Sequence, residues 1–202
     1  MQNLQNRKSV WEQKHNNKDK GALSGCVYAE TVDFLQIRDL VQSEANVLEI
    51  GVGFGYVTEA LSKLCTVSAL DISEVALRRV SGYCLSTYLV EKIETLPADS
   101  FDLIICHNVI QHVPTNLLKA EFKHVIASLK STGVLAVEFI SSKDVVDDGD
   151  VQEVNGIGNY SRTSEFMKLL FSELGGNSVM VVDNKCNIGN ITGCHVFHIR
   201  KK

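Results

Sequence analysis

A short apolar run that breaks into three alternating glycines constrains this chain more than any other feature. The run covers Asn46 to Ile50, and the glycines that follow are Gly51, Gly53 and Gly55. Such a pattern is typical of a β-strand that enters a tight turn. Glycine adopts the left-handed backbone of such turns and lets a ligand approach the main chain closely. The segment therefore predicts a strand, a ligand-binding loop and a helix in succession.

An acid at the end of the next apolar run supports a nucleotide-like ligand. Asp71 follows the run from Thr66 to Leu70. In nucleotide-binding α/β folds an acid about twenty residues past the first glycine binds the ribose hydroxyls. The alternative is that Asp71 only caps the next helix, for which Ser73 is also suited. We expect the first half of the chain to bind a cofactor that contains adenosine.

The glycine spacing indicates which class of cofactor is bound. A dinucleotide fingerprint reads G-x-G-x-x-G, but Tyr56 stands where its third glycine belongs. The pattern here is E-x-G-x-G-x-G, with Glu49 ahead of the first glycine. An acid so close to the loop would repel a pyrophosphate, whereas it suits a cationic amine or sulfonium.

With this loop the sequence resembles the class I S-adenosylmethionine-dependent methyltransferases, in particular their small-molecule, type 11-like domains. The segment 101–114 is similar to the family's fourth-strand motif, and 129–138 to its helix, glycine turn and fifth strand. The order of motifs agrees from Asn46 to Ile140. The resemblance implies a single Rossmann-like, doubly wound α/β sheet, mostly parallel with an antiparallel C-terminal strand and helices on both faces. It also implies S-adenosyl-L-methionine as cofactor and S-adenosyl-L-homocysteine as product.

The resemblance further implies which residues hold the cofactor. The loop would face its methionine portion with Glu49 near the ammonium, and Ile72 would lie against the adenine. Relatives often bind the adenine amino group with an acid after the third strand, but Lys92 stands there and cannot accept a hydrogen bond, so Glu94 is the nearest substitute. The expected cofactor-binding residues are Glu49, Gly51, Gly53, Gly55, Asp71, Ile72, Ile93, Glu94, His107 and Asn108.

Two histidines after the fourth strand are the catalytic candidates. His107 and Asn108 should open onto the site, because ligands bind at the carboxyl ends of strands in such sheets. His112 matches the second histidine of the family's paired histidines, and Gln111 replaces the first. Histidine is suited to act as a general base. Alternatively, His112 only anchors its loop, since methyl transfer needs little more than alignment of the reactants.

We expect one domain over residues 1–202. It divides into an N-terminal helical or lid segment (1–44), a cofactor-binding core (45–140), a candidate acceptor-site loop (141–161) and a C-terminal helix and strand pair (162–202). Trp11 either belongs to a lid over the cofactor or anchors a terminal helix in the core. The acidic loop either contacts the acceptor or is a solvated surface. The expected helices cover 28–42, 55–64, 73–80, 117–129 and 163–174, and the expected strands cover 46–50, 66–70, 87–90, 101–106, 133–140, 178–183 and 194–201.

Composition narrows the function further. The formal net charge is −4 and the longest basic run is the terminal Arg200 to Lys202, which disfavours nucleic acid as a partner. No apolar run approaches the roughly 20 residues of a membrane span, and the N-terminus lacks the apolar core of a signal peptide, so we expect a cytoplasmic protein. The six cysteines form no CxxC pair, and neither a metal site nor disulfides are expected.

These observations favour an enzyme of class EC 2.1.1.- that methylates an O or N atom of a small-molecule or sugar-like acceptor. Two alternatives remain. One is a non-catalytic methyltransferase-fold partner subunit, for which Lys92 is a minor argument. The other is a nicotinamide-dependent oxidoreductase, which Tyr56 disfavours. The sequence leaves the identity of the acceptor and the oligomeric state open.

Overall fold

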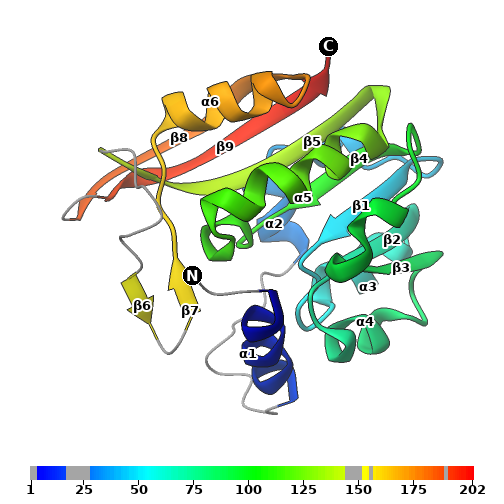
Figure 1. Cartoon of the computed structure of the whole chain (residues 1–202). Helices are drawn as coiled ribbons and strands as arrows, with labels where there is room; N and C mark the ends of the chain where they lie inside the picture. The colour runs from blue at the N-terminus through cyan, green and yellow to red at the C-terminus, as the bar shows by residue number, and fades with distance from the viewer. Residues whose placement is uncertain (1–3, 17–27, 144–151, 155–156, 189–190) are drawn as a thin grey trace.

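The computed structural model describes residues 4–16, 28–143, 152–154, 157–188 and 191–202 (Figure 1). Its main sheet has seven strands in the order β3-β2-β1-β4-β5-β9-β8. These strands are β1 (Asn46–Ile50), β2 (Thr66–Asp71), β3 (Ser86–Leu89), β4 (Phe101–Cys106), β5 (Leu129–Ser142), β8 (Gly176–Ile188) and β9 (Ile191–Lys201). A separate pair consists of β6 (Gln152–Val154) and β7 (Ile157–Asn159).

The strand directions confirm the expected fold class. Strands β1 to β5 pair in parallel, whereas β9 runs antiparallel to both β5 and β8. The sheet order reverses next to β1, so that β1 pairs with β2 on one side and β4 on the other. Ligand sites of open α/β sheets lie at such a reversal, outside the carboxyl ends of the strands.

Helices cover both faces of the sheet, because successive apolar residues of the central strands point to opposite sides. Leu48 and Ile104 pack in one core with Phe122 and Phe171, which come from α5 and α6. Val47 and its neighbours pack in a second core with residues of α2 and α3. The helices are α1 (Leu4–Asn16), α2 (Tyr28–Phe34), α3 (Tyr56–Ser62), α4 (Glu74–Val80), α5 (Thr115–Ser128) and α6 (Ser164–Glu173).

Several boundaries differ from the sequence expectation, and two of these differences have a clear physical reason. The helix expected over 28–42 ends at Phe34, since Gln36 takes a left-handed φ of 53° and a 3-10 helix, η1 (Arg38–Leu40), follows. The glycine turn expected before the fifth strand is absent, because β5 begins directly at the end of α5. Gly133 lies inside β5, where a Cβ would come within 2.7 Å of the Phe101 carbonyl oxygen. The glycine therefore allows close approach of two strands.

The acidic segment 141–161 is described only in part. Residues 144–151 and 155–156, which include Asp144, Asp147, Asp148 and Asp150, lie outside the described residues. Figure 1 places the β6–β7 pair away from the main sheet. After β7, the Tyr160 amide donates to the Gln111 carbonyl at 2.6 Å. None of the described helices is long and apolar enough to cross a bilayer.

Candidate functional site

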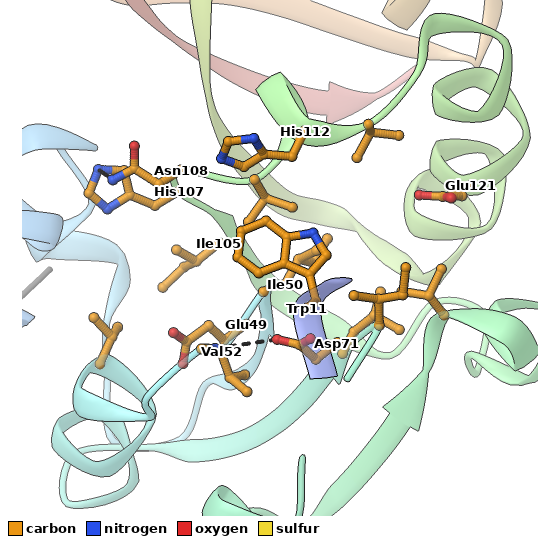
Figure 2. A pocket seen from close by; sticks show the side chains of 18 of the residues that line it. Trp11, Glu49, Ile50, Val52, Asp71, Ile105, His107, Asn108, His112 and Glu121 are labelled. Carbon is orange, nitrogen blue, oxygen red and sulfur yellow. Dashed lines mark hydrogen bonds between the residues drawn. The ribbon is translucent and has the colours of Figure 1, made fainter. Parts of the chain in front are cut away.

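A cavity of about 360 Å³ lies at the carboxyl ends of β1, β2 and β4, with α1 beside it (Figure 2). This volume is in the range of small-molecule sites. The cavity brings together almost all of the residues expected from the sequence. Its lining includes Glu49, Gly51, Gly53, Gly55, Asp71, Ile72, Ile93, His107, Asn108 and His112.

Glycine is needed at the three loop positions for different structural reasons. All three take left-handed φ angles, 77° at Gly51, 52° at Gly53 and 83° at Gly55. A Cβ on Gly51 would overlap Val109, and one on Gly55 would overlap Val80. A Cβ on Gly53 would meet nothing within 4 Å. Gly51 and Gly55 are therefore required for packing, while Gly53 leaves its face open to a ligand.

Asp71 ends β2 and is directed at the glycine loop. Its Oδ1 accepts a hydrogen bond from the Ser73 amide at 2.8 Å, and its Oδ2 accepts from the Gly53 amide at 3.3 Å. Burial nevertheless raises the pKa of Asp71 to about 6. The helix cap is Ser73, whose hydroxyl accepts from the Ala76 amide at 3.2 Å. Asp71 is therefore not needed as the cap of α4.

Glu49 is a second buried carboxyl group on the same cavity. The Thr58 hydroxyl donates to Glu49 Oε2 at 2.6 Å. Burial raises the pKa of Glu49 to about 8, and the nearby charge of Asp71 adds to the shift. Two carboxyl groups that ionise reluctantly would be stabilised by a cationic ligand. The two carboxyl groups and the open face at Gly53 thus fit a cofactor that carries a ribose, an ammonium and a sulfonium.

Both ring nitrogens of His107 contact protein groups. Nδ1 lies 3.2 Å from the Thr31 hydroxyl, and Nε2 lies 3.2 Å from Oε2 of Glu138 on β5. The same Glu138 oxygen accepts from the Asn108 amide at 2.8 Å, where Asn108 takes a left-handed φ of 57°. Burial lowers the pKa of His107. This arrangement favours a positioning role for His107 over that of a base.

The loop after β4 places His112 on the wall of the cavity. The 3-10 helix η3 (Ile110–His112) places its imidazole edge-on to the Trp11 indole, with ring centroids 5.3 Å apart. Arg162, which is buried, fixes this loop by donating to the Ile110 carbonyl at 3.0 Å and to the Val113 carbonyl at 2.5 Å.

Helix α1 contributes Trp11, which the sequence offered as a lid residue or a core anchor, and also Arg7 and His15, which the sequence pattern does not single out. Trp11, Arg7 and His15 all line the cavity, and Trp11 is half-buried there and contacts His112. Arg7 forms an ion pair with Glu121 of α5 at 2.8 Å. Burial lowers the pKa of His15 to about 4. The residues of these contacts are far apart in sequence, so no local motif could have indicated them.

Glu94 is the one expected residue that does not line the cavity. The 3-10 helix η2 (Val90–Thr95) turns Val90 and Ile93 inward and leaves Lys92 and Glu94 exposed. The hypothesis that Glu94 replaces the missing acid at Lys92 therefore has no geometric support. Among the described residues, no cluster of potential metal ligands is present.

Comparisons with known proteins agree with this geometry. Residues 47–133 match a family model described as a methyltransferase domain. A ubiquinone biosynthesis O-methyltransferase of Xanthomonas campestris is 31% identical over 100 residues, which are 45% of this chain and 41% of that protein. The corresponding protein of Xanthomonas oryzae is 29% identical over 134 residues, 54% of this chain and 56% of its own. The chain thus spans about half the length of the curated relatives it matches.

Solved structures with the same fold cover nearly the whole chain. A Burkholderia thailandensis 1,6-didemethyltoxoflavin-N1-methyltransferase, with its substrate and S-adenosylhomocysteine bound, has a TM-score of 0.72 at 15% identity and covers 100% of this chain and 92% of its own. A complex of DhpI with S-adenosylhomocysteine has a TM-score of 0.69 at 17% identity over 98% of this chain and 96% of that chain. At such identities the likeness shows the fold alone.

Proposed function

We propose that this chain, in which residues 47–133 match a methyltransferase domain, transfers a methyl group from S-adenosyl-L-methionine to an O or N atom of a small-molecule acceptor. One observation carries the proposal: Gly53, Asp71 and Glu49 face one cavity at the switch point of the sheet. This cofactor requires backbone that a ligand can approach, an acid that binds the ribose and an acid that compensates positive charge, which Gly53, Asp71 and Glu49 would provide in this order.

In this proposal the chain's residues divide the cofactor between them. When bound, the cofactor supplies an electrophilic methyl group on a sulfonium. Asp71 accepts hydrogen bonds from the ribose hydroxyls, and Glu49 compensates the ammonium charge. Ile72 and Ile93 pack against the adenine. Alignment of the acceptor with the methyl group then provides most of the catalysis.

The acceptor would enter beside Trp11 and His112. Their rings form an edge-to-face pair at the cavity, which suits a planar acceptor ring. The cavity is lined by polar as well as apolar residues, so that a sugar-like acceptor also fits. We assign His112 as the base that takes a proton from an acceptor hydroxyl or ring N–H. His107, held by Glu138 and Thr31, orients Asn108 and the loop. One relative named above is a ubiquinone biosynthesis O-methyltransferase and one similar structure is a 1,6-didemethyltoxoflavin-N1-methyltransferase, and these names support an O or N atom of a small molecule as the acceptor.

The decisive experiment is calorimetric titration of the protein with S-adenosylhomocysteine and, separately, with NAD. We expect micromolar binding of the former only, and a loss of at least about tenfold in Asp71→Asn, the scale of a charged hydrogen bond. Acceptor hydroxyls and ring nitrogens would then be screened for methyl transfer. Binding of NAD would instead support the oxidoreductase alternative, and binding of neither ligand the partner-subunit alternative.

A further inference from the structure

We infer that Glu121 of α5 binds the adenine amino group, in place of the acid that this chain lacks after β3. The inference rests on the proposed function, since it assigns one end of the same cofactor site. Three observations carry it: the absence of a hydrogen-bond acceptor on η2, the position of Glu121, and a carboxylate oxygen of Glu121 that has no hydrogen-bond partner among the described residues.

The first observation is that η2 presents no side-chain acceptor to the cavity. Val90 and Ile93 line the cavity, but both are apolar. Lys92 lines a different surface hollow together with Glu74 and Arg78. An adenine packed against Val90 and Ile93 would therefore need a hydrogen-bond acceptor from another element.

The second observation is that Glu121 lies on the wall that η2 and α5 share. The two elements are in contact, and Glu121 lines the cavity beside Phe122 and Val125 of the same helix. Figure 2 shows its carboxyl group directed from α5 into the cavity, on the other side of Trp11 from His107 and Asn108. Glu121 thus lies across Trp11 from His107 and Asn108, among apolar side chains that suit a flat base.

The third observation concerns the pairing of the carboxylate. Glu121 Oε1 accepts from Arg7 Nη1 at 2.8 Å, and within the described part of the chain no partner of Oε2 is found. Arg7 is itself buried, and its Nε lacks a partner among the same residues. A carboxylate acceptor beside a guanidinium donor complements adenine, whose amino group donates next to the ring nitrogen N1, an acceptor. Arg7 also holds the carboxylate in place.

The inference is tested by comparing S-adenosylhomocysteine with its purine analogue, in which hydrogen replaces the amino group and N1 remains an acceptor. Calorimetry would measure both affinities for the full chain and for Glu121→Gln, with Glu94→Gln as the matched control. We expect the wild type to prefer the adenine ligand by roughly tenfold or more, because the analogue offers no donor to the Glu121 carboxylate. Glu121→Gln should bring the two affinities within about threefold, since a neutral amide oxygen accepts a weaker hydrogen bond than a carboxylate does. Glu94→Gln should keep the wild-type preference.

Two results would overturn the inference while leaving the proposed function intact: Glu121→Gln that retains the wild-type preference, or Glu94→Gln that loses it. A wild type that binds neither ligand overturns both. Because Glu121→Gln leaves the buried Arg7 charge without its partner, the double variant Arg7→Gln/Glu121→Gln is titrated alongside, with thermal unfolding to verify the fold. It should also lose the preference, and its retention of that preference would equally overturn the inference.

Discussion

Gly53 differs from the two other loop glycines in what surrounds it. Its neighbours Gly51 and Gly55 are closely packed against Val109 and Val80, whereas Gly53 has open space where a side chain would begin. Replacing Gly51 or Gly55 would therefore disturb the fold and the site together. A substitution at Gly53 acts on ligand access, which makes it the informative position.

We expect Gly53→Val to abolish binding of S-adenosylhomocysteine, with an affinity loss of roughly 100-fold or more. The branched side chain would occupy the space of the ligand, and the left-handed φ of 52° adds strain of about 1–3 kcal/mol. Gly82→Val is the control, because Gly82 also has open space but no left-handed φ. Calorimetry and thermal unfolding of both variants would check this. Normal binding by a folded Gly53→Val would remove the loop from the cofactor site.

The proposed role of His112 can be separated from loop anchoring by kinetics. If His112 is the base, His112→Ala should lower kcat by about 10²–10⁴-fold and abolish the acidic limb of the pH profile. Affinity for S-adenosylhomocysteine should change less than about twofold, since the imidazole faces Trp11 and not Asp71. His124→Ala on α5 is the control, because His124 does not line the cavity. Turnover close to wild type would show that positioning alone carries the reaction.

At the scale of elements, α1 is held to the core mainly by polar contacts. Lys8 pairs with Glu74 at 2.8 Å and with Glu91 at 3.1 Å, and the Glu12 carboxylate accepts from the Glu74 amide at 2.6 Å. At its C-terminal end, Arg79 of α4 donates to the His15 carbonyl at 3.0 Å. Contacts of this kind are weaker than apolar burial and are screened by salt.

Arg79 connects this helix to the glycine loop. Besides its bond to His15, its guanidinium donates to the Gly53 carbonyl at 3.1 Å and lies 4.8 Å from the centre of the Phe54 ring. We expect Arg79→Ala to weaken S-adenosylhomocysteine binding by roughly three- to tenfold, the scale of one or two hydrogen bonds. Faster amide hydrogen exchange over residues 11–16 should accompany the loss.

Arg78→Ala provides the matched control for Arg79→Ala. Arg78 is adjacent and exposed, and its guanidinium lies 3.7 Å from the carboxylate of Glu74 on the same helix. It should leave both affinity and exchange unchanged. Equal effects of the two variants would indicate a general loss of charge and would contradict the connecting role of Arg79.

The sequence predicted the parts of the site that depend on local pattern. The glycine loop, Asp71 and the residues after β4 lie where strand ends meet, and alternating strands and helices determine that meeting. The α1 contacts and the Arg7–Glu121 pair were not predictable, because helix α1 has no apolar stripe to signal its docking and pairs across distant segments leave no local signal. The sequence did not indicate that Glu94 faces away from the cavity, because a shift of one residue along η2 decides which side chains face inward.

At the scale of the whole molecule, the two buried carboxyl groups couple the site to folding. The pKa of Glu49 is raised to about 8 from an ordinary 4.5, and that of Asp71 to about 6 from 3.8. Both groups bind protons more tightly in the folded state than in the unfolded state. Their contribution to stability is therefore fully present below about pH 4 and is lost as pH rises through the folded pKa values. The ligand-free protein keeps a destabilising pair in its cavity at neutral pH.

This coupling predicts a pH-dependent effect of Glu49→Gln. Gln cannot ionise, so the variant should match the wild type near pH 4 and exceed its free energy of unfolding increasingly between about pH 4.5 and 8, where Glu49 is ionised in the unfolded state but protonated in the folded state. The buried histidines His15 and His107, whose pKa values are lowered, contribute the same pH dependence to both proteins and cancel in the difference. A gain of about 1 kcal/mol would raise Tm by roughly 2–4 °C in a chain of this size.

Urea denaturation at intervals of pH checks this prediction, with Glu165→Gln on the exposed face of α6 as the control. The control should run parallel to the wild type at every pH. Parallel curves for Glu49→Gln as well would mean that Glu49 ionises normally in the folded protein. Divergence that grows between about pH 4.5 and 8 and then levels off would instead assign the loss of stability to Glu49, because the contribution of Asp71 is common to both proteins. The same charge would then be available to a cationic ligand, so a stability cost in the free protein would become binding energy in the complex.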